Sequence, residues 1–233
     1  MKRIIIITAL FFSLATLTAA ESRKVIASEP KNELGLDITL LLSNLFGWND
    51  YYFYDYGYPY GIYNNPAGNY IISYKRYFQR SAIRFGMGGS LNNYSTDAED
   101  AGYSSKNENS QFNFRIGYEC EHPIGEKFNF YYGADIVTSI SGYNMETHYV
   151  DLTNDYTSTS KSFLIGGGPV AGISWLINPR LKLTTEASLY FISGSTDTET
   201  KYEANPEWSS SAHSTSAQLV TGYPIFLNLE FKF

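Results

Sequence analysis

Hydrophobic and polar residues alternate with a period of two along much of this chain. The clearest case is the last eleven residues, where every second side chain from Tyr223 to Phe233 is large and apolar. Asn228, Glu230 and Lys232 fall between them. A period of two is that of a β-strand with two different faces, and a tilted strand of about 9–11 residues crosses a bilayer. The C-terminal segment therefore predicts a membrane-crossing β-strand.

Seven earlier segments carry the same alternation, which gives eight predicted strands. They are residues 34–43, 69–78, 82–91, 111–121, 128–138, 163–177 and 181–191. In these segments one face is more uniformly bulky and apolar, and the other is rich in glycine, serine, threonine and charged residues. Large apolar side chains suit lipid and small or polar ones suit a narrow interior, which is the reverse of a soluble ligand-binding barrel. Pro169 lies within one segment and predicts a bulge or an unpaired position there.

The connections between these segments alternate in length. Those at 79–81, 122–127 and 178–180 are short, whereas those at 44–68, 92–110, 139–162 and 192–217 are long and polar. This alternation is typical of outer-membrane barrels, and hydrocarbon tolerates no unpaired sheet edge. The pattern predicts an all-β fold, an eight-stranded antiparallel up-and-down transmembrane β-barrel. The third and fourth long connections are rich in Ser, Thr and Tyr, so their strands are expected to extend above the membrane.

A ten-stranded barrel is the structural alternative. In that arrangement the tyrosine-rich part of the first long connection forms an additional hairpin, with its turn at residues 57–61.

The C-terminal strand resembles the assembly signal of bacterial outer-membrane barrels. Its signal residues are Tyr223, Leu229, Phe231 and Phe233. At the level of strand and loop pattern the chain resembles small barrels such as the OmpA transmembrane domain and OmpX. The resemblance implies an architecture, contact with outer-membrane lipid and lipopolysaccharide, and recognition of the last strand by the barrel assembly machinery. It implies no activity.

The N-terminal twenty residues have the composition of an export signal. Lys2 and Arg3 precede an apolar run over 4–17, and small residues precede Glu21. We therefore expect a signal peptide at 1–20, a periplasmic linker at 21–33 and a barrel domain at 34–233. The expected location is the bacterial outer membrane, with both termini in the periplasm.

Composition narrows the classes of function. Aromatic residues make up 17% of the chain, too many for a disordered protein, and the formal net charge is −6. An acidic exported chain is a poor candidate for binding nucleic acid. A single cysteine excludes a disulfide framework and any cysteine-based metal site. No loop has calcium-ligand spacing, so we expect neither a metal nor another cofactor.

Charged residues of the non-lipid face are expected to fill the lumen. Strand parity places there the acids Asp37, Glu119, Glu121, Asp135, Glu186 and Glu230 and the bases Lys75, Arg84, Arg115, Lys182 and Lys232. An eight-stranded barrel is only wide enough for its own side chains, and desolvated charges must be paired. The sequence thus predicts a plugged polar lumen. A narrow gated porin-like pore is the alternative, if the pairs exchange partners.

The first long connection is the candidate contact surface. We single out Trp48, Tyr52, Tyr54 and Tyr58, because aromatic side chains offer a large contact area at low entropy cost. A surface glycan or a protein is the ligand that they would suit. The competing interpretation is an aromatic girdle at the outer membrane interface.

A catalytic site is not expected. The three histidines are His122, His148 and His213, and none belongs to a recognisable catalytic motif. The predicted function is therefore non-enzymatic: envelope structure, or surface interaction through the long loops. A lipid-modifying enzyme that uses His148 or His213 is the second alternative.

Overall fold

The computed structural model describes residues 31–39, 70–98, 102–149, 155–222 and 227–233. Among these residues, no helix is long and apolar enough to cross a membrane. The predicted signal peptide, residues 40–69 with Trp48, Tyr52, Tyr54 and Tyr58, and Tyr223 all lie outside the described residues.

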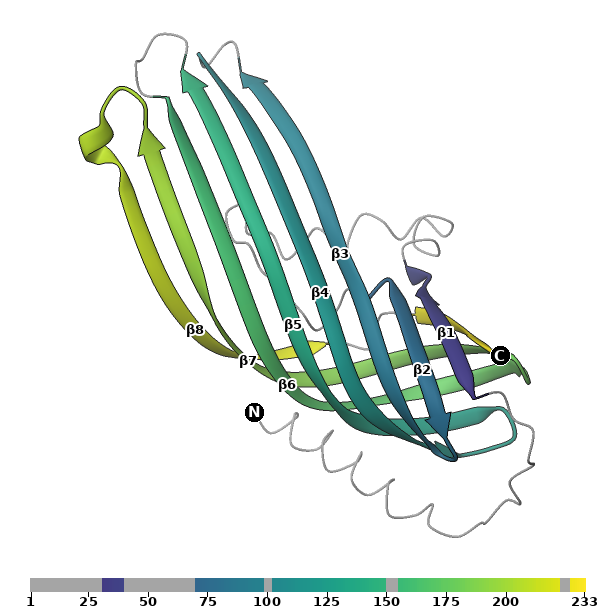
Figure 1. Ribbon diagram of the computed structural model, residues 1–233. Coiled ribbons are helices and arrows are strands. Elements are labelled where there is room, and N and C mark those ends of the chain that lie inside the picture. Colours follow the sequence, from purple (N-terminus) through teal and green to yellow (C-terminus); the bar gives the residue numbers. More distant parts are fainter. Residues whose placement is uncertain (1–30, 40–69, 99–101, 150–154, 223–226) are drawn as a thin grey trace, which may run out of the picture.

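The described chain consists almost wholly of β-strands (Figure 1). They are β1 (Asn32–Asp37), β2 (Ile72–Phe78), β3 (Ser81–Ala98), β4 (Tyr103–Pro123), β5 (Phe128–Tyr149), β6 (Tyr156–Asn178), β7 (Leu181–Tyr202), β8 (Ser210–Gly222) and β9 (Leu227–Lys232). A single turn of 3-10 helix, η2 (Pro206–Trp208), lies between β7 and β8.

The strands close into a ring. Each strand from β1 to β7 pairs antiparallel with the next, and β9 pairs with both β1 and β7. β9 lies along residues 181–185 of β7 and β8 along residues 188–200 of the same edge, so β8 and β9 share one position in the ring. The described residues therefore form an eight-position antiparallel barrel, which confirms the predicted fold class. The additional hairpin of the ten-stranded alternative would lie outside the described residues.

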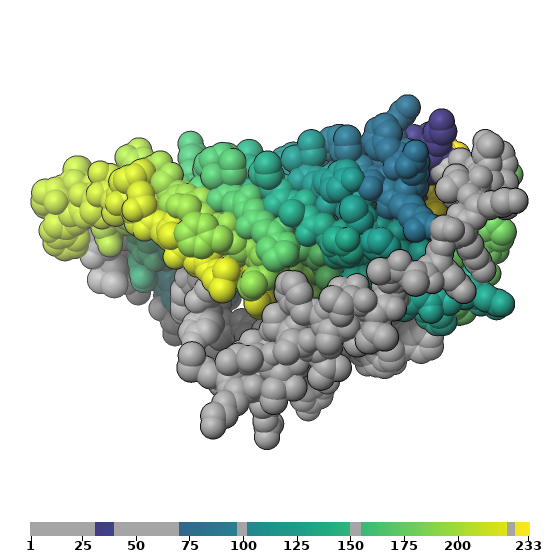
Figure 2. Space-filling model, turned by 90° about the horizontal axis from the view of Figure 1, so that it is seen from below, coloured from purple at the N-terminus to yellow at the C-terminus, as the bar shows by residue number. Residues whose placement is uncertain are grey.

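The short turns and the two ends of the described chain share one end of the barrel. Asn32 and Phe233 exchange backbone hydrogen bonds of 3.1 and 2.9 Å beside these turns. At the opposite end β3 to β8 continue well beyond the closed ring as a curved wall (Figure 1). The molecule is accordingly elongated, with the tip of β7 and β8 at one end and β1 near the other (Figure 2).

The outer surface of the ring is apolar. Phe114, Ile116 and Ile136 point outward and are 44%, 47% and 58% exposed, and comparable residues occupy the outward positions of every strand in the ring. Proteins that are surrounded by water rarely expose so many large apolar side chains on one continuous surface. Lipid hydrocarbon is the environment that they fit, and the predicted assignment of the two faces is confirmed.

Several strands are longer than the sequence predicted. The extension of β5, β6, β7 and β8 into the third and fourth long connections was expected, but β3 and β4 also pair continuously from Asn92–Asn109 up to Ala98–Tyr103. There neither face is apolar, so hydrophobic alternation gave no signal. β1 also begins two residues early, at Asn32, and so places Glu33 in the barrel instead of the predicted linker.

Pro169 causes no bulge. The β5–β6 register is continuous across Ala134–Pro169, and the β6–β7 ladder only omits Gly168 and Pro169, as a missing N–H requires. The register shift in this strand pair lies instead between Leu176 and Asn178.

Candidate functional site

The inner face of the ring gathers buried charges. Seven charged side chains there belong to residues that are at most 3% exposed: Glu33, Lys75, Arg84, Glu119, Asp135, Lys182 and Glu230. Arg115, Glu121 and Glu186 lie beside them. They come from β1, β2, β3, β4, β5, β7 and β9, so almost every strand of the ring contributes a charge.

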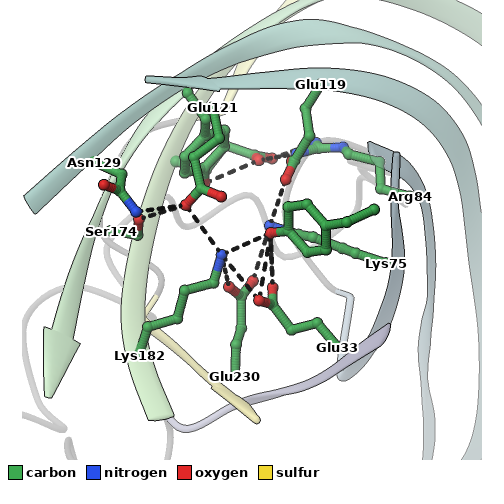
Figure 3. Close-up of polar contacts among 12 residues, drawn as sticks. Glu33, Lys75, Arg84, Glu119, Glu121, Asn129, Ser174, Lys182 and Glu230 are labelled. Atoms are coloured by element: carbon green, nitrogen blue, oxygen red, sulfur yellow. Dashed lines mark hydrogen bonds and ion pairs between the residues drawn. The ribbon is translucent and has the colours of Figure 1, made fainter. Parts of the chain in front are cut away.

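Two lysines organise the part of the lumen nearer the short turns (Figure 3). Lys75 Nζ lies 3.1 Å from Glu119 and 3.2 Å from Glu230. Lys182 Nζ, from the opposite side of the ring, lies 3.0 Å from Glu33 and 3.2 Å from Glu230. Glu230 and Glu33 are shared by both lysines, since Glu33 also lies 3.7 Å from Lys75. The shared carboxylates tie β1, β2, β7 and β9 together at the closing seam.

Two arginines organise the part nearer the long strands. Arg84 contacts three carboxylates, those of Glu119, Asp135 and Glu186, at 3.1, 2.6 and 2.5 Å. Arg115 contacts Glu186 at 2.6 Å. The Arg84 guanidinium binds Asp135 and Glu186 with two hydrogen bonds each, which is the strong geometry for such pairs. Glu119 joins this group to the lysines.

Tyrosines and glycines complete the lumen packing. Tyr190 donates a hydrogen bond of 2.7 Å to Asp135, and Lys182 donates one of 2.9 Å to the Tyr77 hydroxyl. The Arg115 side chain crosses Gly86, where an added Cβ would lie 2.6 Å from Arg115 Nε. Glycine at this inward position therefore makes room for the long side chain from the neighbouring strand.

Most of the lumen residues predicted from parity lie together. Lys75, Arg84, Arg115, Glu119, Asp135, Lys182, Glu186 and Glu230 form one connected network, and Glu121 joins it through Lys182. Asp37 lies apart: its carboxylate accepts a hydrogen bond from the Thr39 N–H, and it makes no ion pair with another described residue. Lys232 lies at the edge of the network, with its Nζ 4.9 Å from the Tyr77 ring centre.

Glu33 is the network residue that the sequence prediction missed. It has the same parity as Asp37, but it precedes Leu34, the first apolar residue of the pattern. Its cross-strand partners are Lys75 on β2 and Lys232 on β9. These two lysines are the signal that identifies Glu33 as a lumen residue, but they can be recognised as its neighbours only when the strand register is known.

The described residues of the predicted assembly signal lie on or beside the closing strand. Leu229 and Phe231 belong to β9 and pair with Leu36 and Leu34 of β1, while Phe233 follows directly and is 56% exposed. The contact that closes the ring is therefore made by the residues that the C-terminal pattern singled out.

The histidines lie outside the lumen. His122 stacks on Tyr132 with ring centres 5.5 Å apart. His148 Nδ1 contacts Asp155, and His213 Nδ1 lies 2.6 Å from Asp197. Across the described ranges no group of three or more His, Cys, Asp and Glu residues is placed to hold a metal ion. The two histidine–aspartate pairs bind strand ends together near the long connections.

Asp155 offers a test of this local geometry. The Tyr149 N–H donates a 2.8 Å hydrogen bond to its carboxylate, and this bond, followed by the His148 contact, lowers the pKa of Asp155 below its ordinary value of 3.8. A lowered pKa means that the stabilisation is complete above the ordinary pKa and is lost as the pH falls through the lowered one. We expect the Asp155 carboxyl carbon to titrate below 3.8 by NMR. Titration at or above that value would contradict the hydrogen bond, and His148→Gln should retain most of the shift.

The chain was compared with known families and structures. No family model matches it, and no curated protein matches it. Among solved structures, a major outer membrane protein from Thermus thermophilus has a TM-score of 0.43 and 12% identity, covering 89% of this chain and 100% of that one. The ferric yersiniabactin uptake receptor FyuA from Yersinia pestis has a TM-score of 0.40 and 10% identity, covering 64% of this chain. This chain spans only 24% of that receptor.

Proposed function

We propose that this protein is a non-enzymatic barrel of the bacterial outer membrane with a closed lumen, of the same general type as the OmpA and OmpX barrels. It serves envelope structure or surface interaction. The observation that carries the proposal is the buried ion network, because charges from seven strands meet inside a ring with an apolar exterior.

The network favours a plug over a pore. Each of its four central cations contacts at least two carboxylates. Opening a path would separate several desolvated pairs at once, and each unpaired buried charge costs about 3–5 kcal/mol. The exterior in turn fits lipid and lipopolysaccharide as surroundings.

The remaining parts of the proposal concern the ends of the chain and its loops. A cleaved signal peptide at 1–20 exports the protein, both termini lie in the periplasm, and the barrel assembly machinery recognises the C-terminal strand. Trp48, Tyr52, Tyr54 and Tyr58 are the proposed contacts of the first loop with a surface glycan or protein. The alternation of short and long connections supports this orientation.

Single-channel recording of the refolded full chain in a planar bilayer tests the closed lumen. We expect no steady conductance from protein whose folding is shown by its faster migration on unheated gels. Arg115→Gln and Glu119→Gln are the informative variants, because each removes one charge from the network without changing the strand pattern. A steady open state in the unaltered protein, with a size or ion preference altered in these variants, would overturn the plug and make the protein a narrow pore.

A further inference from the structure

Charged and uncharged side chains are sorted between the two faces of the long strands beyond the ion network. We call the inward positions of this region the inner wall. They are the alternate residues of 88–94 in β3, 103–113 in β4, 139–149 in β5, 156–162 in β6, 194–202 in β7 and 210–218 in β8. Pairing identifies this face, because the buried Asn107 and Thr147 lie on it and their partners Tyr94 and Tyr156 share it. Within these described positions the inner wall has no charged residue.

The outward face of the same strands is rich in charge. Lys106 pairs with Glu108 at 2.8 Å, and Lys201 pairs with Glu199 at 3.1 Å. The His148–Asp155 and His213–Asp197 contacts also involve outward histidines. The inner wall is therefore neutral although the chain around it is not.

Aromatic rings line the end of the inner wall farthest from the lumen. The ring centres of Tyr103 and Tyr149 lie 6.1 Å apart, and those of Tyr156 and Tyr202 lie 5.6 Å apart. Trp208 of η2 meets Tyr202 edge-on at 6.1 Å and is 55% exposed. Tyr94 of β3 also lies on the inner wall. The aromatic rings therefore come from five strands, β3 to β7, and from η2.

Hydroxyl and amide groups cover the inner wall between this rim and the ion network. Ser160 and Thr198 lie 3.3 Å apart across β6 and β7, and Thr196 donates to Ser162 at 3.1 Å. On β4, Asn113 Nδ2 is buried without a hydrogen-bond partner among the described residues, and so is Asn109 Oδ1. Both atoms are inaccessible, so a ligand would instead meet hydroxyl groups nearer the rim, such as those of Ser158 and Thr200, which are partly exposed and lie 3.4 Å apart.

We propose that the inner wall binds an uncharged oligosaccharide. Sugar hydroxyls both donate and accept hydrogen bonds, which matches rows of serine, threonine and asparagine, and the apolar faces of sugar rings stack on aromatic side chains. A charged polymer finds no opposite charge on this wall, and an apolar ligand would leave its polar groups unsatisfied. The site rests on the surface-interaction part of the proposed function, for which it supplies a ligand class. Because the ion network lies below it, the site recognises the glycan and does not conduct it.

Calorimetric titration of the refolded full chain in detergent micelles tests this site. The probes are maltohexaose and the hexamer of N-acetylglucosamine, both uncharged, with hexagalacturonate as the charged counterpart. We expect at least one uncharged probe to bind with a Kd of about 0.1–1 mM and hexagalacturonate to bind at least about tenfold more weakly.

Two variants on the same strand pair separate the faces. Tyr156→Ala with Tyr202→Ala removes a tilted ring pair from the inner wall and should weaken binding about tenfold or more. Thr157→Ala with Lys201→Ala alters the adjacent cross-strand pair on the outward face and should leave binding unchanged. Trp208→Ala, outside the strands, gives a second inner variant if the tyrosine pair impairs folding.

Three results would overturn the proposal: no binding of either uncharged probe, equal binding of hexagalacturonate, or equal loss in the inner and outward variants. Gel migration and bilayer silence report on the closed barrel independently. A folded, silent barrel that binds no uncharged probe would therefore remove the glycan site and leave the proposed function standing.

Discussion

Replacing Arg84 with alanine is expected to destabilise the barrel more than any other single change in the lumen. Arg84 contacts Glu119, Asp135 and Glu186, and it is 1% exposed, so all three ion pairs are shielded from bulk water. Removing one partner from a buried ion pair costs about 3–5 kcal/mol, and here three carboxylates lose a shared cation. The free energy of unfolding, measured by guanidinium titration in detergent micelles, should fall by at least that amount, or the variant should fail to refold.

Two further variants serve as controls for Arg84→Ala. Arg84→Lys retains the charge but not the paired hydrogen bonds, so its stability should lie between those of Arg84→Ala and the unaltered protein. Arg180→Ala removes an exposed arginine from the β6–β7 turn and should leave stability unchanged. If Arg84→Ala were as stable as Arg180→Ala, the network would be energetically unimportant and the closed-lumen proposal would lose its physical basis.

Leu229→Pro is expected to prevent the ring from closing. Leu229 lies in β9 between Leu36 of β1 and Leu183 of β7, so this strand is hydrogen-bonded on both sides. Proline removes the N–H, and an unpaired backbone group in hydrocarbon costs several kcal/mol. The variant should lose the fast-migrating folded band on unheated gels.

Leu229→Ala is the matched control. It shortens the side chain of Leu229 but retains its N–H, and it should retain the folded band. Loss of the folded band in the alanine variant as well would show that the side chain, and not closure of the ladder, determines folding at this strand. A folded band in both variants would show that the ring closes without this backbone N–H.

The sequence predicted strands wherever one face meets hydrocarbon. In β5, Ile136 and Ile140 alternate with Asp135 and Ser139, and this contrast marks the strand unambiguously. Beyond the apolar belt the contrast disappears, as in β4, where Lys106 and Glu108 face outward and Asn107 faces inward. There the strands are held by continued pairing with their neighbours, which hydrophobic alternation does not report.

The lumen network was predicted in part because parity gives the face of a residue but not its height. Parity alone placed Asp37 and Glu119 on the same face, yet only Glu119 contacts the lysine and arginine groups. Height depends on how far each strand is shifted along its neighbour, and Glu33 meets Lys75 and Lys182 through that shift. The pairing itself therefore had to be known before the members of the network could be assigned.

The sharing of Glu33 and Glu230 by Lys75 and Lys182 constrains how the protein can be built. Glu33 lies in β1, the first described strand, and Glu230 lies in β9, the last. Neither lysine therefore has its full set of carboxylate partners until β1 and β9 have both joined the sheet. A sheet that entered the membrane before it closed would expose unpaired ammonium and carboxylate groups to the lipid acyl chains. Insertion and closure should therefore occur as one cooperative event, and stable partly inserted intermediates should be absent from the folding kinetics.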